Sequence, residues 1–209
     1  AGGLGKAGEN TVDEKAIGMV DLAGRLDGIS GRFKPEYQTY ETSAKMYGLS
    51  WLDSFKATRG SINPQDRAKF EEYTAFRQDA TNNLSEYIKY ITGAAMGIQE
   101  EGRIRKGMPD PEKDSPSQFE SKTRNAVAQT KLALARYNYL KRKGYDEKTI
   151  QSLARTDKIG EVAPLQGMQG IINQRLDQAA QELKSRDPRM DDMSLKRALR
   201  GIQRREFGI

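Results

Sequence analysis

The sequence contains no cysteine and no histidine in 209 residues. Without cysteine the chain forms no disulfide and has no thiol nucleophile, and its redox compartment stays open. Without histidine it lacks the most common general base, the usual zinc ligand and every Ser-His or Cys-His catalytic arrangement. It also has no apolar run near the roughly 18 residues that a membrane-spanning helix needs. Enzymatic chemistry would therefore depend on carboxylates, lysine, tyrosine, serine or threonine.

Apolar residues are scarce as well, at 36%, while charged residues make up 31%. The nine tyrosines and six phenylalanines fall mostly at helical spacing, which separates this chain from a disordered one. No segment alternates apolar and polar residues for long enough to predict a strand. We therefore expect an all-α protein, an elongated multi-helix bundle with long amphipathic helices and hinges at proline and glycine.

The first ten residues, AGGLGKAGEN, are rich in glycine and do not begin with methionine. They lack the charged start and apolar centre of a secretory signal. Their Gly-x-Gly-Lys also lacks the spacing and the preceding strand of a phosphate-binding loop. We expect a flexible leader over residues 1–10, and a chain that is a processed product or a piece of a longer polypeptide.

Helical periodicity of the apolar residues predicts a series of helices separated by short turns. They are expected over residues 12–26, 35–55, 64–96, 98–106, 116–143, 147–153, 171–183 and 195–202. The small side chains at positions 93, 94, 95 and 97 let another backbone approach closely or let the long helix bend. We divide the chain into the leader, a helical bundle over 11–143 and a C-terminal basic helical region over 144–209.

Capping signals set most of these helix starts. Asn63 followed by Pro64 predicts the start of the longest helix. Two prolines, at 109 and 111, predict a hinge over residues 107–115. Ser115, with Pro116 after it and Gln118 three residues on, then forms an S-x-x-Q capping box for the next helix.

Similar signals punctuate the C-terminal region. Gly144 is expected to end the helix before it, and Asp146 to cap the short helix after it. Residues 160–167 are expected to form a loop. Asp187, which is followed by proline, ends the next helix, and Ser194 is expected to cap the last one.

Aromatic and aliphatic side chains at helical spacing predict one helix-packing or partner-binding face. Core packing and contact with a partner are both open for this set. It comprises Trp51, Phe55, Phe70, Tyr73, Phe76, Tyr87 and Ile91.

Acidic residues offer no convincing catalytic pair. They occur as neighbours, in Glu71-Glu72, Glu100-Glu101 and Asp191-Asp192. Adjacent residues on a helix point about 100° apart, so they do not share one site, and we interpret them as solvated. We predict no catalytic residue, no cofactor, no metal and no small-molecule ligand, and we do not expect an enzyme.

Basic residues are the remaining candidates for binding. The chain carries 35 Lys and Arg against 29 Asp and Glu, a net charge of +6. Lys196, Arg200 and Arg204 recur every four residues and would form a stripe that neutralises phosphates without reading bases. Two further clusters are Arg103/Arg105/Lys106 and Lys141/Arg142/Lys143. These basic residues have two possible roles, contact with DNA or a simple solvated surface, and both stay open.

The stretch from 91 to 122 resembles large virion proteins of tailed phages, the internal or ejected proteins and the lytic transglycosylase-like polypeptides packaged with them. The resemblance lies in Ile91-Thr92-Gly93-Ala94, in an E-x-x-R element over 100–103, and in a turn with prolines at 109 and 111. Its most specific part is DSP-x-x-F-x-x-K, which comprises Asp114, Ser115, Pro116, Phe119 and Lys122.

The resemblance implies a helical virion or ejection protein that helps genome delivery. Its partners would be other copies and other virion proteins, and its location the capsid interior or tail, then the host periplasm after ejection. A non-sequence-specific nucleic-acid-binding helical protein is the alternative. An enzyme fragment that degrades peptidoglycan is a third hypothesis, which the missing Glu-Ser motif of lytic transglycosylases disfavours.

Overall fold

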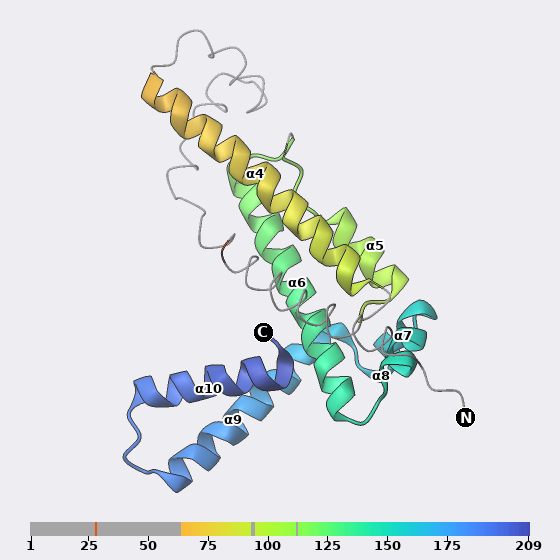
Figure 1. Cartoon of the computed structure of the whole chain (residues 1–209), viewed down its shortest axis with the longest axis vertical. Coiled ribbons are helices and arrows are strands. Elements are labelled where there is room, and N and C mark those ends of the chain that lie inside the picture. The colour runs from red at the N-terminus through yellow and green to blue at the C-terminus, as the bar shows by residue number, and fades with distance from the viewer. Residues whose placement is uncertain (1–27, 29–63, 93–94, 112) are drawn as a thin grey trace, which may run out of the picture. The chain divides into compact units, whose positions relative to one another are not determined.

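The computed structural model of this chain describes residues 28, 64–92, 95–111 and 113–209 (Figure 1). Over these residues the secondary structure is helical, no strand is present, and one isolated bridge joins Thr92 to Met96. The predicted all-α bundle is confirmed. The leader and the helices expected over 12–26 and 35–55 lie outside the described residues.

The described helices keep the labels of Figure 1 and agree largely with the predicted ones. They are α4 Pro64–Ile91, α5 Ile98–Lys106, α6 Pro116–Arg142, α7 Glu147–Arg155, α8 Ile159–Val162, the 3-10 helix η1 Leu165–Gly167, α9 Met168–Arg186 and α10 Asp192–Phe207.

The predicted capping residues account for several of these boundaries. The Ser115 amide donates to Gln118 Oε1 at 3.1 Å, and the Gln118 amide donates to Ser115 Oγ at 3.4 Å, so the capping box at the start of α6 is present. Asp146 accepts from the Thr149 amide at 2.7 Å and caps α7. Gly144 follows α6 with a φ of 93°, a left-handed conformation that favours glycine.

Three boundaries were predicted wrongly. α4 ends at Ile91, before the small-residue segment and not after it. Residues 160–167 are not a plain loop, because α8 and η1 occupy most of them. The N-cap of α10 is Asp191, whose carboxylate accepts from the Ser194 amide at 2.9 Å. Aspartate and serine cap equally well, and the aspartate lies one turn earlier.

The chain divides into two compact units. Among the described residues, unit 1 contains 28, 64–87, 104–111 and 113–128, and unit 2 contains 88–92, 95–103 and 129–209. The long helices α4 and α6 each contribute residues to both. The division expected from the sequence, with a boundary at residue 143, stays a prediction.

Unit 1 has its core between α4 and the first half of α6. Phe76 of α4 meets Phe119 of α6 edge to face, with 6.3 Å between the ring centroids. The periodicity that predicted α4 explains this core, since its buried positions step by three or four residues. The buried apolar residues here are Tyr73, Phe76, Ala80, Leu84, Ile104, Phe119, Ala126 and Val127.

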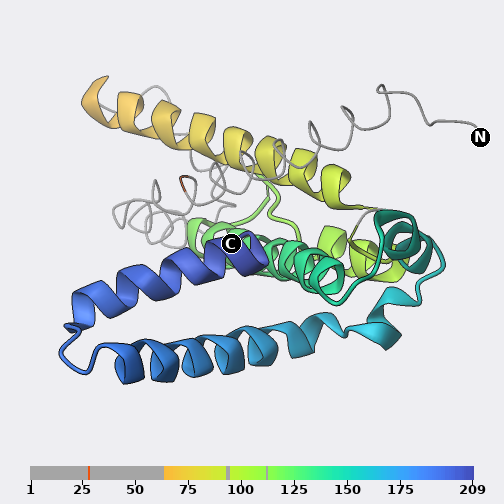
Figure 2. The ribbon, with the colours of Figure 1, turned by 60° about the horizontal axis from the view of Figure 1, so that its bottom comes forward.

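Unit 2 has two apolar clusters. One joins Ala95 to the end of α6 and to α7 and α8, through Tyr137, Leu140, Ile150, Ala154, Ile159 and Ala163. The other joins the middle of α6 to α9 and to the end of α10, through Ala135, Met168, Ile172 and Phe207. α9 and α10 form an antiparallel helical hairpin, and both views show them side by side (Figure 1, Figure 2).

Candidate functional site

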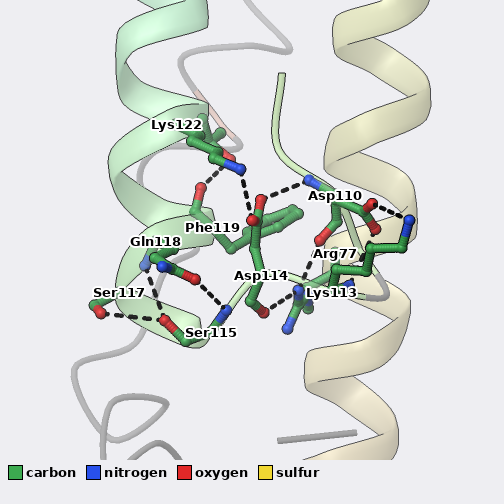
Figure 3. A network of polar contacts seen from close by, with 10 residues as sticks. Arg77, Asp110, Lys113, Asp114, Ser115, Ser117, Gln118, Phe119 and Lys122 are labelled. Atoms are coloured by element: carbon green, nitrogen blue, oxygen red, sulfur yellow. Dashed lines mark hydrogen bonds and ion pairs between the residues drawn. The ribbon is translucent and has the colours of Figure 1, made fainter. Parts of the chain in front are cut away.

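The proline-containing turn before α6 is held by one arginine of unit 1 (Figure 3). Arg77 of α4 is fully buried and donates from NH2 to the carbonyl oxygens of Asp110, at 2.9 Å, and of Asp114, at 2.6 Å. Its guanidinium also lies over the rings of Phe119 and Tyr73, 4.6 and 5.4 Å from their centroids. We call this arrangement the Arg77 turn.

The carboxylate of Asp114 joins the two ends of the Arg77 turn. Its Oδ2 accepts from the Asp110 amide at 2.7 Å, and its Oδ1 accepts from Lys122 Nζ at 2.6 Å (Figure 3). The Asp114 amide in turn donates to the Asp110 carbonyl at 3.2 Å. The aspartate and lysine of the DSP-x-x-F-x-x-K motif are therefore used to fix the turn onto the first turns of α6.

Arg77 is a structural cation and not a ligand-binding one. Burial lowers the pKa of its guanidinium, and nearby Tyr73 and Asp114 offset part of that effect. Arginine stays protonated in folded proteins, so its positive charge is offset locally by peptide oxygens, by ring faces and by nearby Asp114. A side chain with no exposed surface presents no donor to a ligand.

A second buried arginine holds unit 2 together. Arg136 of α6 forms a two-point pair with Glu100 of α5, with NH1 to Oε1 at 2.8 Å and NH2 to Oε2 at 2.6 Å. It also donates to the carbonyl of Ala95 at 2.6 Å and to that of Ala163 at 3.2 Å. One guanidinium thus joins the small-residue segment, α5, α6 and the end of α8.

Glu100 was predicted to be solvated, and this prediction was wrong. Its side chain is only 16% exposed. Burial raises the pKa of its carboxyl, but the hydrogen bond and charge of Arg136, together with the Gly97 amide, outweigh burial and lower the pKa overall. Glu100 is therefore held as a carboxylate and forms a structural ion pair.

The small-residue segment permits this close packing. Gly97 is buried beside Asp157, and a Cβ at Gly97 would collide with Asp157 Oδ1. That carboxylate accepts from the Gln99 amide at the start of α5, at 3.1 Å. The expectation that small side chains let other groups approach the backbone here agrees with these contacts.

The end of α10 is fixed by a carboxylate between two arginines. Glu206 is buried and accepts from Arg175 Nε at 3.0 Å, and it pairs with Arg142 NH1 at 2.7 Å. Burial raises the pKa of Glu206, but the two arginines more than compensate and lower it. Asn138 Nδ2 also donates to the Phe207 carbonyl, at 3.0 Å.

The predicted basic stripe lies on α10 in unit 2. Lys196, Arg200 and Arg204 are all exposed, and so is Arg197 between them. We call these four side chains the basic face of α10. None of the salt bridges found among the described residues involves any of the four.

The other predicted basic clusters are not part of this face. Arg103, Arg105 and Lys106 are exposed on α5. In the last turn of α6, Arg142 pairs with Glu206, while the Nζ atoms of its two lysine neighbours lie 5.6 Å from tyrosine ring centroids, Lys141 over Tyr137 and Lys143 over Tyr139.

The predicted packing face lies only partly within the described structure. Tyr73 and Phe76 are buried in unit 1. Phe70, Tyr87 and Ile91 belong to α4, but their side chains are outside the description, as are Trp51, Phe55, Gly93 and Ala94 altogether. The role of the full set stays a prediction.

The residues that organise both units were missed from the sequence. Arg77 and Arg136 lie within helical stretches where a basic residue is expected to be solvated. One signal was available for each, because both occur in line with the apolar stripe of their helix. Arg77 follows buried Tyr73 by four residues, and Arg136 lies three residues after buried Ala133 and four before buried Leu140.

Comparison with protein-family models, with curated proteins and with solved structures finds no match for this chain. Among the described helices, none combines the length and the apolar character needed to cross a membrane. The described residues also include no group of three or more acidic side chains placed to hold a metal ion.

Proposed function

We propose that this chain is a helical virion or ejection protein of a tailed phage. It acts through contacts with other copies of itself and with other virion proteins during genome delivery, and not through catalysis. In this proposal it resides in the capsid interior or the tail and reaches the host periplasm after ejection.

The observation that carries the proposal is the use made of the motif residues. Asp114, Phe119 and Lys122 are all engaged in the Arg77 turn, and Ser115 caps α6. Residues that resemble the phage pattern therefore build a proline turn between helices. The motif residues make contacts within the turn, so their likeness to the phage pattern supports a common structural element and not a common catalytic site.

The geometry at Glu100 disfavours the enzymatic alternative. A glycosidase general acid needs a carboxyl group whose pKa is raised, so that it carries a proton near neutral pH. Glu100 is the acid of the E-x-x-R element, and Arg136 holds its pKa below the usual value. This carboxylate is suited to an ion pair and not to proton donation. A peptidoglycan zymogram of the purified chain is therefore expected to show no clearing.

Self-association gives the first test. We expect sedimentation velocity from micromolar to near-millimolar protein to show oligomers whose share grows with concentration. The Arg77→Met variant, whose motif turn is loosened, serves as the matched comparison and should assemble less at equal concentration. A monomer that is indifferent to concentration would contradict the proposal.

Location gives the second test. Gradient-purified particles of the virus that encodes the chain should yield its peptides by mass spectrometry in constant ratio to the capsid protein. Particles made without the gene should still package their genome but fail to deliver it. Absence of the chain from purified particles, together with normal infection without it, would refute the virion role.

A further inference from the structure

We propose that the basic face of α10 is a binding site for the phosphate backbone of double-stranded nucleic acid, which it contacts without reading bases. This inference goes beyond the proposed function and does not depend on it, since it concerns a surface that any nucleic-acid-binding protein could use.

The four side chains are arranged along one side of the helix. Lys196, Arg200 and Arg204 step by four residues, and Arg197 lies three before Arg200. At about 1.5 Å of rise per residue the face is about 12 Å long. All four residues are exposed. Cations aligned in this way present their donors to the same partner.

Neighbouring acids within the described structure offset only part of the charge of this face. Glu206, the acid nearest in sequence to Arg204, is buried and already pairs with Arg175 and Arg142. Asp191 before the helix accepts from the Ser194 amide, whereas Asp192 is exposed four residues before Lys196 and offsets part of the charge at that end of the face. The face therefore retains a positive field that can act on an external anion.

The face is also held rigidly. On the opposite side of α10, Leu195, Leu199 and Ile202 are half-buried, and α9 packs against this helix (Figure 2). The last turn is fixed by the Glu206 pairs and by the Asn138 bond to the Phe207 carbonyl. A helix fixed in this way loses little freedom when its exposed side binds a ligand.

Two features favour nucleic acid over an anionic membrane. A surface-bound amphipathic helix inserts its apolar side among the lipid chains, whereas the apolar side of α10 is used against α9. Three of the four cations are arginines, whose planar donors match phosphate oxygens in pairs. B-form DNA carries a phosphate charge about every 1.7 Å, so a 12 Å face meets about seven charges and can contact three or four.

The test measures binding of the full chain to a fluorescent DNA duplex by anisotropy at several salt concentrations, with two unrelated duplex sequences. The variant K196Q/R200Q/R204Q removes three charges of the face, and glutamine keeps the helix propensity. The matched control K148Q/R155Q/K158Q removes three exposed charges elsewhere in unit 2. Circular dichroism verifies that both variants keep their helix content. Vesicles rich in anionic lipid form a separate arm.

We expect the wild-type chain to bind both duplexes alike, with a log–log salt slope of about −3, so that affinity falls on the order of 50-fold between about 50 and 200 mM salt. The face variant should lose at least about tenfold in affinity at low salt. Its log–log salt slope should become shallower, at about −1, because one of the four cations remains. The control should stay close to the wild type.

Several outcomes would overturn the proposal. They are no duplex binding at low salt, equal losses in both variants, and binding to vesicles but not to DNA. Cross-linking of the unmodified chain to the duplex, mapped by mass spectrometry, gives a reading that needs no variant. Adducts on residues 192–207 support the site, and adducts confined to other segments refute it. None of these results bears on whether the chain is found in virus particles.

Discussion

Arg77 in unit 1 and Arg136 in unit 2 are both fully buried, yet their charges are neutralised differently. Arg77 donates to two peptide carbonyls and lies over two aromatic rings. Arg136 also donates to two carbonyls, but its principal partner is the carboxylate of Glu100, which it grips at two points. The Arg136 site therefore includes a titratable carboxylate that accepts from both terminal nitrogens of the guanidinium.

The comparison shows how a helical chain poor in apolar residues can still fix its turns. In each unit a single long cation satisfies carbonyl oxygens from a segment that has no regular hydrogen-bonding partner. The two solutions differ in what they require from the rest of the chain. In unit 2 the guanidinium pairs with an ionised acid, and in unit 1 it packs against two aromatic rings with Asp114 nearby.

Replacing Arg136 with methionine should have the largest effect. The change removes the cation that pairs with the Glu100 carboxylate and donates to two carbonyl oxygens, which should cost about 3–5 kcal/mol of unfolding free energy. Denaturant unfolding measures the loss, and hydrogen exchange should locate faster opening in residues 95–103 and 159–163. Arg155→Met, on the exposed side of α7, is the control and should change stability by less than about 0.5 kcal/mol. Equal stabilities for the two variants would show that the ion pair contributes nothing.

Replacing Arg77 with methionine should have a smaller effect. The two carbonyl oxygens of the Arg77 turn lose a donor, but the apolar replacement keeps contact with Phe119, so we expect about 2–3 kcal/mol. Gln78→Met, exposed on the same helix, serves as the control. The faster hydrogen exchange should be confined to residues 108–118. Faster exchange spread equally over both units would break the contrast between the two arginines.

The smallest expected effect is the loss of stability at the Arg136 site when acid protonates Glu100. The folded pKa of Glu100 lies below its usual value, so its contribution is present above about pH 4.5 and is lost as the pH falls through the folded pKa. Glu100→Gln should cost about 1–2 kcal/mol at pH 7, and its difference from the wild type should shrink on acidification. Glu206 has a pKa shift of the same sign, so the variant keeps some acid sensitivity.

Chemical denaturation at pH 7 and near pH 4 measures this difference, with Glu161→Gln on α8 as the exposed control. A constant difference between Glu100→Gln and the wild type at both pH values would argue against an ionised Glu100 in the folded chain.

Local signals in the sequence were sufficient for most of the helices. Pro64 and Pro116 mark helix starts because the ring presets φ and lacks an amide that would go unused there. Asp146 and Gly144 set the short connection between α6 and α7 for similarly local reasons. Such features depend on neighbours within four residues, so one sequence contains all the information they need.

The buried polar contacts could not be predicted in this way. Glu100 and Arg136 are 36 residues apart, and nothing near either residue indicates the other. α8 is only four residues long, too short for its periodicity to stand out from a loop. The stripe of Lys196, Arg200 and Arg204 was predicted from spacing alone, without Arg197, since exposed residues on a regular helix need no information about distant partners.

Arg136 also sets the order in which unit 2 can be completed. Its guanidinium donates to the carbonyl of Ala95, 41 residues earlier in the chain, and to that of Ala163, 27 residues later. During synthesis at about 5–20 residues per second, the earlier segment must therefore wait several seconds for its final partners. Contacts between such distant parts of a chain slow folding. Nascent chains arrested before Ala163 should leave residues 95–103 open to protease, and release of the finished chain should close them.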